Sequence, residues 1–230
     1  MRARVRLLST HVALLGGPVA HSLSPHMQNA AFAATGLDWR YDAFDVDDVI
    51  AAVAALRTLG FAGANVTIPY KEQVVAACDE ADGDAVNTLV FRDGRVRGFN
   101  TDKEILAGID ATRACVIGGG GAAKALAPGL PADTRRFTRR GDWPPDATGC
   151  DLIVNATPVR DEVFVHLSSD QTVVDLAYGP DETALVTAAR AAGCTVVDGR
   201  EALVRQGAAS FRIWTGLEPP VEAMRAAVRI

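Results

Sequence analysis

The sequence predicts an α/β fold in two lobes with a cleft between them, and three observations lead to this expectation. Strand-like and helix-like stretches alternate along the chain, a pattern typical of parallel, doubly wound sheets covered by helices. The chain has 230 residues, 49% of them hydrophobic, so it can bury a substantial core as one large domain or two modest ones. Residues 141–149, "GDWPPDATG", have the composition of a linker.

The first half of the chain predicts strands at 12–15, 41–46 and 63–68, separated by helices at 25–34 and 47–59. Two further strands, at 85–90 and 95–99, flank Asp93-Gly94, a pair that suits a tight hairpin turn. The second half predicts strands at 114–117, 135–138, 152–155, 172–176 and 195–197, and helices at 183–192, 201–215 and 220–228.

Charge and cysteine usage narrow the class of protein. A net charge of −5 and a pI near 5.4 argue against a nucleic-acid binder. The four cysteines are widely spaced and form no CxxC pair, so we expect reduced thiols, no metal site and a cytoplasmic protein: Cys78, Cys115, Cys150 and Cys194. The basic and apolar start imitates a signal peptide, but Ser9, Thr10 and His11 interrupt the apolar run. That run is too short for a membrane span, so 11–15 is interpreted as a first strand and no membrane partner is expected.

A glycine-rich turn in the second lobe predicts a dinucleotide site. "ACVIGGGGAAKAL" places an apolar strand directly before Gly118-x-Gly120-x-x-Ala123, followed by helix-forming residues. We expect the pyrophosphate to approach the backbone of four residues: Gly118, Gly120, Gly121 and Ala122. The alternative to a cofactor site is a turn that only packs a strand against a helix.

The residues about 20 positions further on indicate which nicotinamide cofactor is bound. NAD enzymes place a carboxylate there for the ribose 2′-hydroxyl, whereas this chain has Thr138-Arg139-Arg140. Two guanidinium groups and a hydroxyl suit a 2′-phosphate, so we expect NADP (NADPH). A solvated basic turn is the alternative.

The stretch "GANVTIPYKE" (63–72) predicts a second functional feature. It begins as a buried strand that carries the polar residues Asn65 and Thr67, and Pro69 then ends the strand because proline has no N–H to donate. Lys71 follows directly on the turn. Ligands of open α/β sheets bind beyond the carboxyl ends of strands, so we expect Lys71 to face the cleft.

Eight blocks in order show that the chain resembles the shikimate dehydrogenase family almost from end to end. They are "HSLSPHMQNAAF" (21–32), "NVTIPYKE" (65–72), "DAVNTLV" (84–90), "GFNTD" (98–102), "IGGGGAA" (117–123), "NATPV" (155–159), "DLAYGPDETAL" (175–185) and "VRQGAASFRIWTG" (204–216). The resemblance implies NADP-dependent, reversible reduction of 3-dehydroshikimate to shikimate in aromatic amino-acid biosynthesis, in a protein that is a monomer or homodimer. It also implies an open α/β substrate-binding lobe at 1–101 plus 200–230 and a Rossmann-like NADP-binding lobe at 102–199.

The resemblance also implies site residues. Lys71 and Asp102 match the catalytic pair of the family, in which the lysine acts as a proton donor and the carboxylate orients it. The substrate-binding positions match Ser22 and Ser24 for the carboxylate, and Thr67, Asn87, Tyr178 and Gln206 for the ring side. Asn155 and Thr157 match cofactor-binding positions. The bland alternatives are a surface lysine for Lys71, helix caps for Asp102 and Ser24, and turn residues for Ser22 and Asn87.

The chain departs from the family pattern at several positions, and it is shorter by a few tens of residues. Gln28 replaces a histidine, Lys103 a glycine, Arg160-Asp161 a Gly-Met pair and Ala202 a methionine. The two lost methionines line the nicotinamide site in relatives. Two alternatives therefore stay open: a quinate or aminoshikimate dehydrogenase, and a non-catalytic protein that binds shikimate as a sensor or partner subunit.

Overall fold

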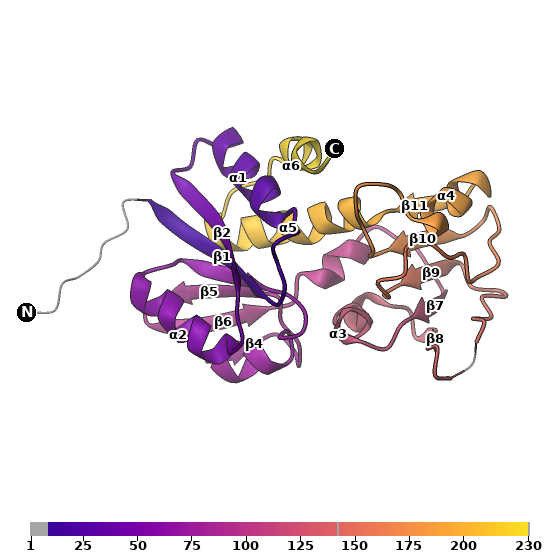
Figure 1. Cartoon of the computed structure of the whole chain (residues 1–230), viewed down its shortest axis with the longest axis horizontal. Helices are drawn as coiled ribbons and strands as arrows, with labels where there is room; N and C mark the ends of the chain where they lie inside the picture. Colours follow the sequence, from indigo (N-terminus) through magenta and orange to yellow (C-terminus); the bar gives the residue numbers. More distant parts are fainter. Residues whose placement is uncertain (1–8, 142, 230) are drawn as a thin grey trace, which may run out of the picture. The chain divides into compact units, whose positions relative to one another are not determined.

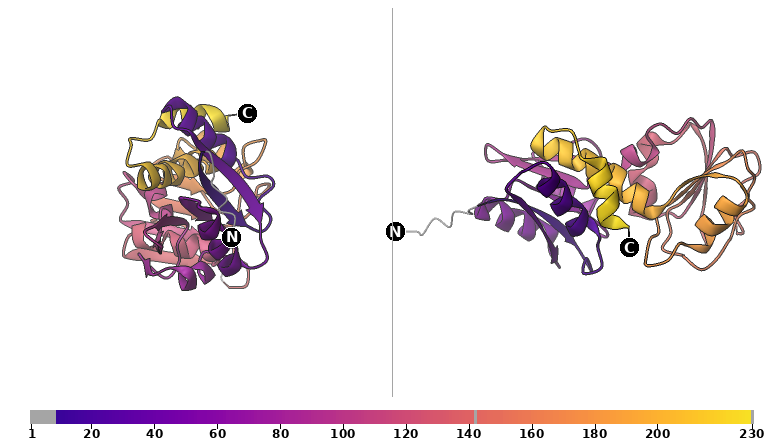
Figure 2. Two further views of the ribbon diagram at one scale, coloured as in Figure 1. Left: turned by 90° about the vertical axis from the view of Figure 1, so that its left-hand side faces the viewer. Right: turned by 90° about the horizontal axis from the view of Figure 1, so that it is seen from above.

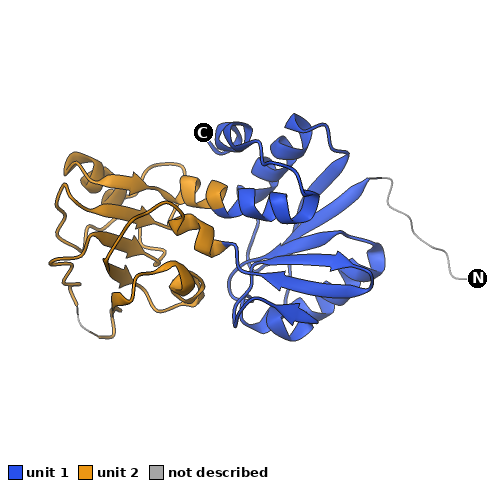
Figure 3. Ribbon diagram, turned by 180° about the vertical axis from the view of Figure 1, so that it is seen from behind, with its two compact units in different colours: residues 1–101, 206–229 blue, residues 102–205, 230 orange. Residues whose placement is uncertain are grey.

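The computed structural model describes residues 9–141 and 143–229, and the chain divides into two compact units (Figure 3). Unit 1 runs to Thr101 and resumes at Gln206–Arg229, and unit 2 comprises Asp102–Arg205. The division falls within helix α5 (Gly199–Thr215), a few residues beyond the boundary at residue 200 drawn from the sequence. The basic residues of the signal-like start, 1–8, lie outside the described residues.

Unit 1 contains a six-stranded sheet in the order β2-β1-β3-β5-β6-β4 (Figure 1). Its strands are β1 (Thr10–Gly16), β2 (Trp39–Asp45), β3 (Gly63–Val66), β4 (Glu80–Ala81), β5 (Thr88–Arg92) and β6 (Arg95–Phe99). β1 pairs in parallel with β2 and β3, whereas β5 is antiparallel to β3 and β6. The sheet is therefore mixed and not parallel throughout, because the turn at Asp93-Gly94, with φ of 52° and 74°, reverses the chain directly.

Strand parity decides which residues of unit 1 face which helices. Alternate side chains of β1 and β3 point to one face of the sheet: Ala13, Leu15, Ala64 and Val66. They form a core with three residues of helix α2 (Val49–Leu59), namely Val49, Val53 and Leu56. On the opposite face, Trp214 of α5 donates its indole N–H to the carbonyl oxygen of Leu89 at 3.0 Å. Phe211 of α5 stacks on Phe32 of helix α1 (Ser24–Ala34), with ring centroids 5.7 Å apart.

Helix α6 (Val221–Val228) packs beside α1, as the views in Figures 1 and 2 show. α2 begins at an Asp48 cap, whose carboxylate accepts the backbone N–H groups of Ile50 and Ala51, and it ends at Gly60 with φ of 85°. These local signals are the ones the sequence pattern uses to place helices.

Unit 2 contains a five-stranded sheet in the order β11-β10-β9-β7-β8, parallel throughout (Figure 1). Its strands are β7 (Arg113–Ile117), β8 (Asp133–Phe137), β9 (Leu152–Asn155), β10 (Thr172–Asp175) and β11 (Thr195–Val197). Ala114 and Val116 pack on the face that also takes Leu126. Cys115 and Ile117 pack on the face covered by helix α4 (Ala184–Ala191).

Several connections are short where relatives were expected to be longer. Helix α3 (Gly121–Ala125) has five residues and passes into the 3-10 turn η3 (Ala127–Gly129), as Pro128 predicts. The other short elements are the 3-10 helices η1 (Gln73–Ala77), before Asp84, and η2 (Asp102–Leu106). The described residues between β8 and β9 form no helix. Among the described residues, none of the helices is both long and apolar enough to span a membrane.

Candidate active site

One edge of the unit 1 sheet collects the residues expected to bind substrate. β1 and β3 end at this edge, β5 begins there and β6 ends there, since Thr88 pairs with Asn65 and with Phe99. The segments that leave or enter the sheet at this edge carry six of the predicted residues or their neighbours: Ser22, Ser24, Thr67, Lys71, Asn87 and Thr101. Topology therefore gathers side chains that are far apart in the sequence.

Ser22 and Ser24 lie at the start of α1, after the loop that leaves β1. The Ser22 hydroxyl accepts the backbone N–H of Ser24 at 3.2 Å, and Ser24 is buried in the first turn of the helix. Pro25 occupies the start of the helix, whose Leu23 cap makes no side-chain cap bond. Ser24 is thus the first helical residue and not the cap.

The turn after β3 positions Lys71. β3 ends at Val66, and the carbonyl oxygen of Thr67 accepts the N–H of Tyr70 at 3.0 Å, which closes the turn. The Tyr70 hydroxyl donates to the carbonyl oxygen of Val46 at 2.6 Å, which anchors the turn. The carbonyl oxygen of Lys71 accepts the N–H of Val86 at 2.9 Å, so the lysine backbone lies beside the segment that leads into Asn87.

Asn87 and Gln206 meet in unit 1, with Asn87 Nδ2 and Gln206 Oε1 3.5 Å apart. Beneath them lies a buried polar network of Asn65, Thr88, Thr101 and Ser210, which sequence reasoning missed. Its sequence signal was present: "NT" occurs in both "DAVNTLV" and "GFNTD", and Ser210 lies one helical turn after Gln206. This network explains why the buried strand β3 carries the polar residue Asn65.

Two of the residues predicted for catalysis and substrate binding lie in unit 2. Asp102 is buried, at 7% exposure, and begins η2. Tyr178 is half-buried in the segment that follows β10.

The turn after β7 fits a dinucleotide phosphate. Gly118 has φ of 117°, and a Cβ there would lie 2.9 Å from the carbonyl oxygen of Ala156, so only glycine fits. A Cβ at Gly120 or Gly121 would meet no atom within 4 Å, which leaves open space over the backbone at the start of α3. These positions therefore form a cradle that a phosphate group fits.

The basic residues predicted to hold the 2′-phosphate follow β8. Thr138 lies beside the cradle, since a Cβ on Gly119 would be 3.2 Å from its methyl group. Arg139 forms an ion pair with Glu162, and its guanidinium lies 5.1 Å from the ring centroid of Trp143. Arg140 is exposed.

Asn155 and Thr157 hold the segment after β9 in place. Asn155 Oδ1 accepts the Thr157 hydroxyl at 2.7 Å and the Thr157 N–H at 3.0 Å, and its Nδ2 donates to Asp175 at 2.8 Å. Burial raises the pKa of Asp175 above its usual range, against the opposing hydrogen bonds from Thr183, Ala177 and Asn155. Asn155 is fully buried, and both ends of its side chain are occupied within the protein.

The departures from the family pattern have structural counterparts. Arg160 packs its guanidinium against Gly179 and donates to the carbonyl oxygen of Asp181 at 2.7 Å. Arg200 donates to the carbonyl oxygens of Gly179 and Pro180 at 2.6 and 2.8 Å. Two arginines therefore hold the 179–181 loop, which follows Tyr178 directly.

Two further departures, Ala202 and Gln28, are packing positions, whereas Lys103 and Asp161 are exposed. Ala202 is buried in a core cluster of unit 2 with Ile105 and Leu106. Gln28 is fully buried, and its Nε2 donates to the carbonyl oxygen of Gly207 at 2.9 Å, which ties α1 to α5.

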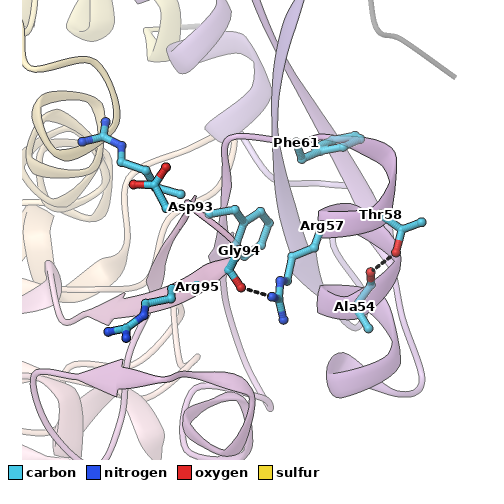
Figure 4. Close-up of a pocket in the computed structure, with 9 residues that line it drawn as sticks. Ala54, Arg57, Thr58, Phe61, Asp93, Gly94 and Arg95 are labelled. Carbon is cyan, nitrogen blue, oxygen red and sulfur yellow. Dashed lines mark hydrogen bonds between the residues drawn. The ribbon is translucent and has the colours of Figure 1, made fainter. Parts of the chain in front are cut away.

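A pocket of about 480 Å³ lies at the opposite edge of the unit 1 sheet, between the end of α2 and the β5–β6 turn (Figure 4). Arg57 donates to the carbonyl oxygen of Gly94 within it, and the Arg95 side chain points away from Arg57, where Glu80 pairs with it. None of the predicted site residues lines this pocket. The described residues contain no group of three metal-ligating side chains, and all four cysteines are unpaired thiols.

The chain is similar to known proteins over most of its length. Residues 14–89 match the family model of the shikimate dehydrogenase substrate binding domain, and residues 199–229 match that of the shikimate 5′-dehydrogenase C-terminal domain. The chain is 38% identical to the shikimate dehydrogenase (NADP(+)) of Moorella thermoacetica, over 95% of this chain and 92% of the relative. That alignment spans 276 positions, more than the 230 residues of this chain, so this chain lacks segments that the relative has.

Solved structures extend the similarity to the fold. A shikimate dehydrogenase in complex with NADP+ is 33% identical with a TM-score of 0.84, covering 95% of this chain and 94% of the other. Shikimate 5-dehydrogenase from Thermus thermophilus, in complex with NADP(H) and shikimate, is 31% identical with a TM-score of 0.81, covering 95% and 98%. The chain therefore belongs to the shikimate dehydrogenase family.

Proposed function

We propose that the protein catalyses the NADP-dependent, reversible reduction of 3-dehydroshikimate to shikimate, with Lys71 and Asp102 as the catalytic pair. Unit 1 is the substrate-binding unit and unit 2 is the dinucleotide-binding unit. The observation that carries the proposal is the gathering, at one sheet edge, of hydroxyl, amide and ammonium groups in a chain of this family. A polyol acid offers little apolar surface, so such donors and acceptors must recognise it.

The proposed roles follow from the chemistry of each side chain. Ser22 and Ser24 bind the substrate carboxylate, and Thr67, Asn87, Gln206 and Tyr178 contact the ring side. When bound, reduced NADP supplies the hydride that converts the ring ketone to an alcohol. The Lys71 ammonium donates the proton that the new alcohol oxygen requires, and Asp102 holds that ammonium in place.

The proposed cofactor residues are those of the unit 2 cradle. Gly120, Gly121 and Ala122 present backbone N–H groups to the pyrophosphate, and Thr138, Arg139 and Arg140 bind the 2′-phosphate. Gly118, whose own N–H donates to the carbonyl oxygen of Phe137 at 2.9 Å, lets the backbone approach the pyrophosphate because it has no side chain. Thr157 contributes from the segment after β9, with Asn155 as its support. The unpaired thiols are compatible with a cytoplasmic location, which we propose together with a monomer or homodimer.

The test is a spectroscopic assay of the purified protein at the absorbance band of reduced nicotinamide. Shikimate, quinate and an aminoshikimate are each offered with NADP and with NAD. The proposal expects the highest kcat/KM for shikimate with NADP. Preferred turnover of quinate or the amino compound would support the related dehydrogenases. Shikimate binding without turnover of any of the three acids would instead establish a non-catalytic binder.

A control variant separates the site from the rest of unit 1. Arg92 is exposed at the end of β5, next to the β5–β6 turn and at the opposite edge of the same sheet. Arg92→Ala is expected to leave kcat and KM unchanged. A loss of activity in this variant would mean that charge, and not the site geometry, governs turnover.

A further inference from the structure

Asp175 is a buried carboxylate of unit 2 to which the proposed reaction assigns no role. It is the last residue of β10, and its side chain is fully buried. Its Oδ1 accepts the side-chain N–H of Asn155 at 2.8 Å and the backbone N–H of Ala177 at 3.0 Å, and its Oδ2 accepts the Thr183 hydroxyl at 2.6 Å. None of these three donors carries a charge. A carboxylate buried without a cation is costly unless hydrogen bonds compensate, and its removal would leave buried donors unsatisfied.

The bond from Asn155 fixes the segment 155–159. Because Asn155 Nδ2 donates to Asp175, its Oδ1 points the other way, where it accepts both the N–H and the hydroxyl of Thr157. Turning the amide over would set its oxygen against the carboxylate and its NH₂ group against the Thr157 N–H. The N–H of Val159 in turn donates to the Thr157 hydroxyl at 3.3 Å. The conformation of the segment that carries Thr157 therefore depends on an acceptor at Asp175.

The other two bonds fix the ends of the segment 177–183. The N–H that Asp175 accepts from Ala177 belongs to the residue directly before Tyr178. Thr183 caps α4 by accepting the N–H of Val186 at 3.1 Å, and it donates its own proton to Asp175. The segment that carries Tyr178 is therefore tied to the same carboxylate at its beginning and at its end.

Backbone bonds join the two segments directly. The N–H of Leu176 donates to the carbonyl oxygen of Asn155 at 2.9 Å, and the N–H of Ala184 donates to that of Arg160 at 2.7 Å. Asp175 and Asn155 are also register partners at the carboxyl ends of the parallel strands β10 and β9. Ligands of open α/β sheets bind beyond this end of the strands. Asp175 thus lies at the centre of a hydrogen-bonded cluster where a ligand of unit 2 is expected.

We infer that Asp175 is a positioning residue, which holds the segment carrying Thr157 and the segment carrying Tyr178 in a fixed relation to each other. The loss of this one carboxylate weakens the binding of both cofactor and substrate, although its buried side chain contacts neither. The inference rests on the proposed function, because it takes Thr157 to bind NADP and Tyr178 to contact shikimate. It deepens that function by identifying the group of unit 2 that aligns the two contacts.

The experiment is a pair of double-mutant cycles, read as dissociation constants of NADP by fluorescence titration and of shikimate by calorimetry. Asp175→Ala should raise both constants by about tenfold or more, because it releases both segments. In the wild-type background, Thr157→Val should raise the constant for NADP roughly 3- to 10-fold, and Tyr178→Phe should do the same for shikimate. In the Asp175→Ala background each should add less than about twofold, because its segment is already released. Additive losses in either cycle, or no effect of Thr157→Val or Tyr178→Phe on wild type, would overturn the inference.

Asp151→Ala is the matched control. Asp151 directly precedes β9, at the end opposite to Asn155, and its carboxylate also accepts three hydrogen bonds, from Thr112 and Arg113. Its loss should destabilise unit 2 and leave both dissociation constants at the wild-type values. If Asp151→Ala weakens both ligands as Asp175→Ala does, general destabilisation is the cause and the inference is overturned.

Asp175→Asn tests whether the hydrogen bonds or the charge matter. The asparagine oxygen can still accept from Asn155 and Ala177, and the new NH₂ group can donate to the Thr183 hydroxyl. Both dissociation constants should therefore stay within about threefold of wild type. A loss as large as that of Asp175→Ala would assign the effect to the charge and reject the inference.

Two single-segment variants decide the matter if Asp175→Ala does not fold. Asn155→Ala releases only the segment 155–159, so the affinity for NADP should fall and that for shikimate should stay. Thr183→Val releases only the end of the segment 177–183, so the opposite pattern is expected. Circular dichroism checks that both variants are folded. Loss of both ligands in either variant, or of neither, would contradict the inference.

Turnover of shikimate separates the two proposals. If wild type turns over shikimate but either cycle is additive, only the inference fails. If wild type binds NADP and shikimate without turnover and both cycles are non-additive, the proposed reaction fails and the inference stands. If wild type binds neither ligand, both are wrong.

Discussion

Arg139 and Glu162 form an ion pair in unit 2, where the 2′-phosphate of NADP is proposed to bind. Arg139 lies over Trp143, so the ring and the carboxylate together set the direction of its guanidinium. Both partners are about half exposed, at 53% and 50% of their side-chain area. Exposed ion pairs contribute little to the stability of a fold. The effect of Glu162 is therefore on the Arg139 guanidinium itself, which it orients and for which it competes with a phosphate.

Arg139→Ala should weaken NADP and spare NAD. A charge-assisted bond to a phosphate contributes about 1.5–3 kcal/mol, so NADP affinity should fall roughly ten- to a hundredfold. Dissociation constants of both cofactors, measured by fluorescence titration, test this expectation. Equal losses for NADP and NAD would mean that Arg139 acts on the fold and not on the phosphate.

Glu162→Gln should strengthen NADP binding. In the wild type, NADP must displace Glu162 from Arg139, which costs up to about 1 kcal/mol of binding free energy. Without this carboxylate, the affinity for NADP should rise by up to about fivefold. Glu182→Gln is the control, since Glu182 forms a comparably exposed pair with Arg190 in the same unit. A weaker affinity for NADP in Glu162→Gln would show that orientation by Glu162 outweighs competition.

Lys71→Ala should lose most of kcat while the fold and NADP binding persist. General acid catalysis contributes typically 10²–10⁴-fold to the rate, so kcat should fall by about that factor. Asp102→Asn should also slow turnover, and the double variant should be little worse than Lys71→Ala, because the two act as one unit. Steady-state kinetics with circular dichroism as the folding check decide this. Fully additive losses would contradict a catalytic pair.

Arg160→Ala should loosen the 179–181 loop. It removes the bond to the carbonyl oxygen of Asp181 and the packing on Gly179, leaving Arg200 as the remaining anchor of this loop among the described contacts. Faster amide hydrogen exchange in 177–182 is expected, together with a higher shikimate KM if Tyr178 contacts the substrate. Arg113→Ala, an exposed arginine of β7, is the control. Unchanged exchange would leave Arg160 without the anchoring role.

Asp151 should make unit 2 sensitive to acid. Its carboxylate accepts the N–H of Thr112 at 2.9 Å, the Thr112 hydroxyl at 2.7 Å and the N–H of Arg113 at 2.9 Å. These bonds, that of the Thr112 backbone first, lower the pKa of Asp151 to about 2 from 3.8. A lowered pKa stabilises the fold above the unfolded value, and this contribution is lost as pH falls from about 4 toward 2.

Asp151→Asn should therefore be less stable than wild type at neutral pH, by on the order of 1 kcal/mol. The difference should close as the pH falls through this window. Urea unfolding followed between pH 2 and pH 7 measures it, with the exposed Asp110→Asn as the control. A difference that is constant with pH would reject the carboxylate as the cause.

The sequence by itself determined the two α/β sheets, the motifs that carry the proposed catalytic pair and the glycine turn, because each depends on residues close in the chain. Helix α2 between its Asp48 cap and Gly60 and the Asp93-Gly94 hairpin are local effects of this kind. The strand predicted to run to Ile68 and stop at Pro69 ends earlier, at Val66. The expectation of a parallel sheet in unit 1 was wrong, although the sequence predicted the Asp93-Gly94 hairpin that makes this sheet mixed.

Tertiary structure alone decided what surrounds those motifs. Ser210 lies 122 residues from Thr88 in sequence and 2.8 Å from it in space, and no local pattern relates the two. The pairing of Arg139 with Glu162, and the anchoring of 179–181 by Arg160 and Arg200, likewise join separate connections of one sheet. Donor and acceptor roles are assigned only when every partner is in place, so the direction of the Asn87 amide is a property of the fold.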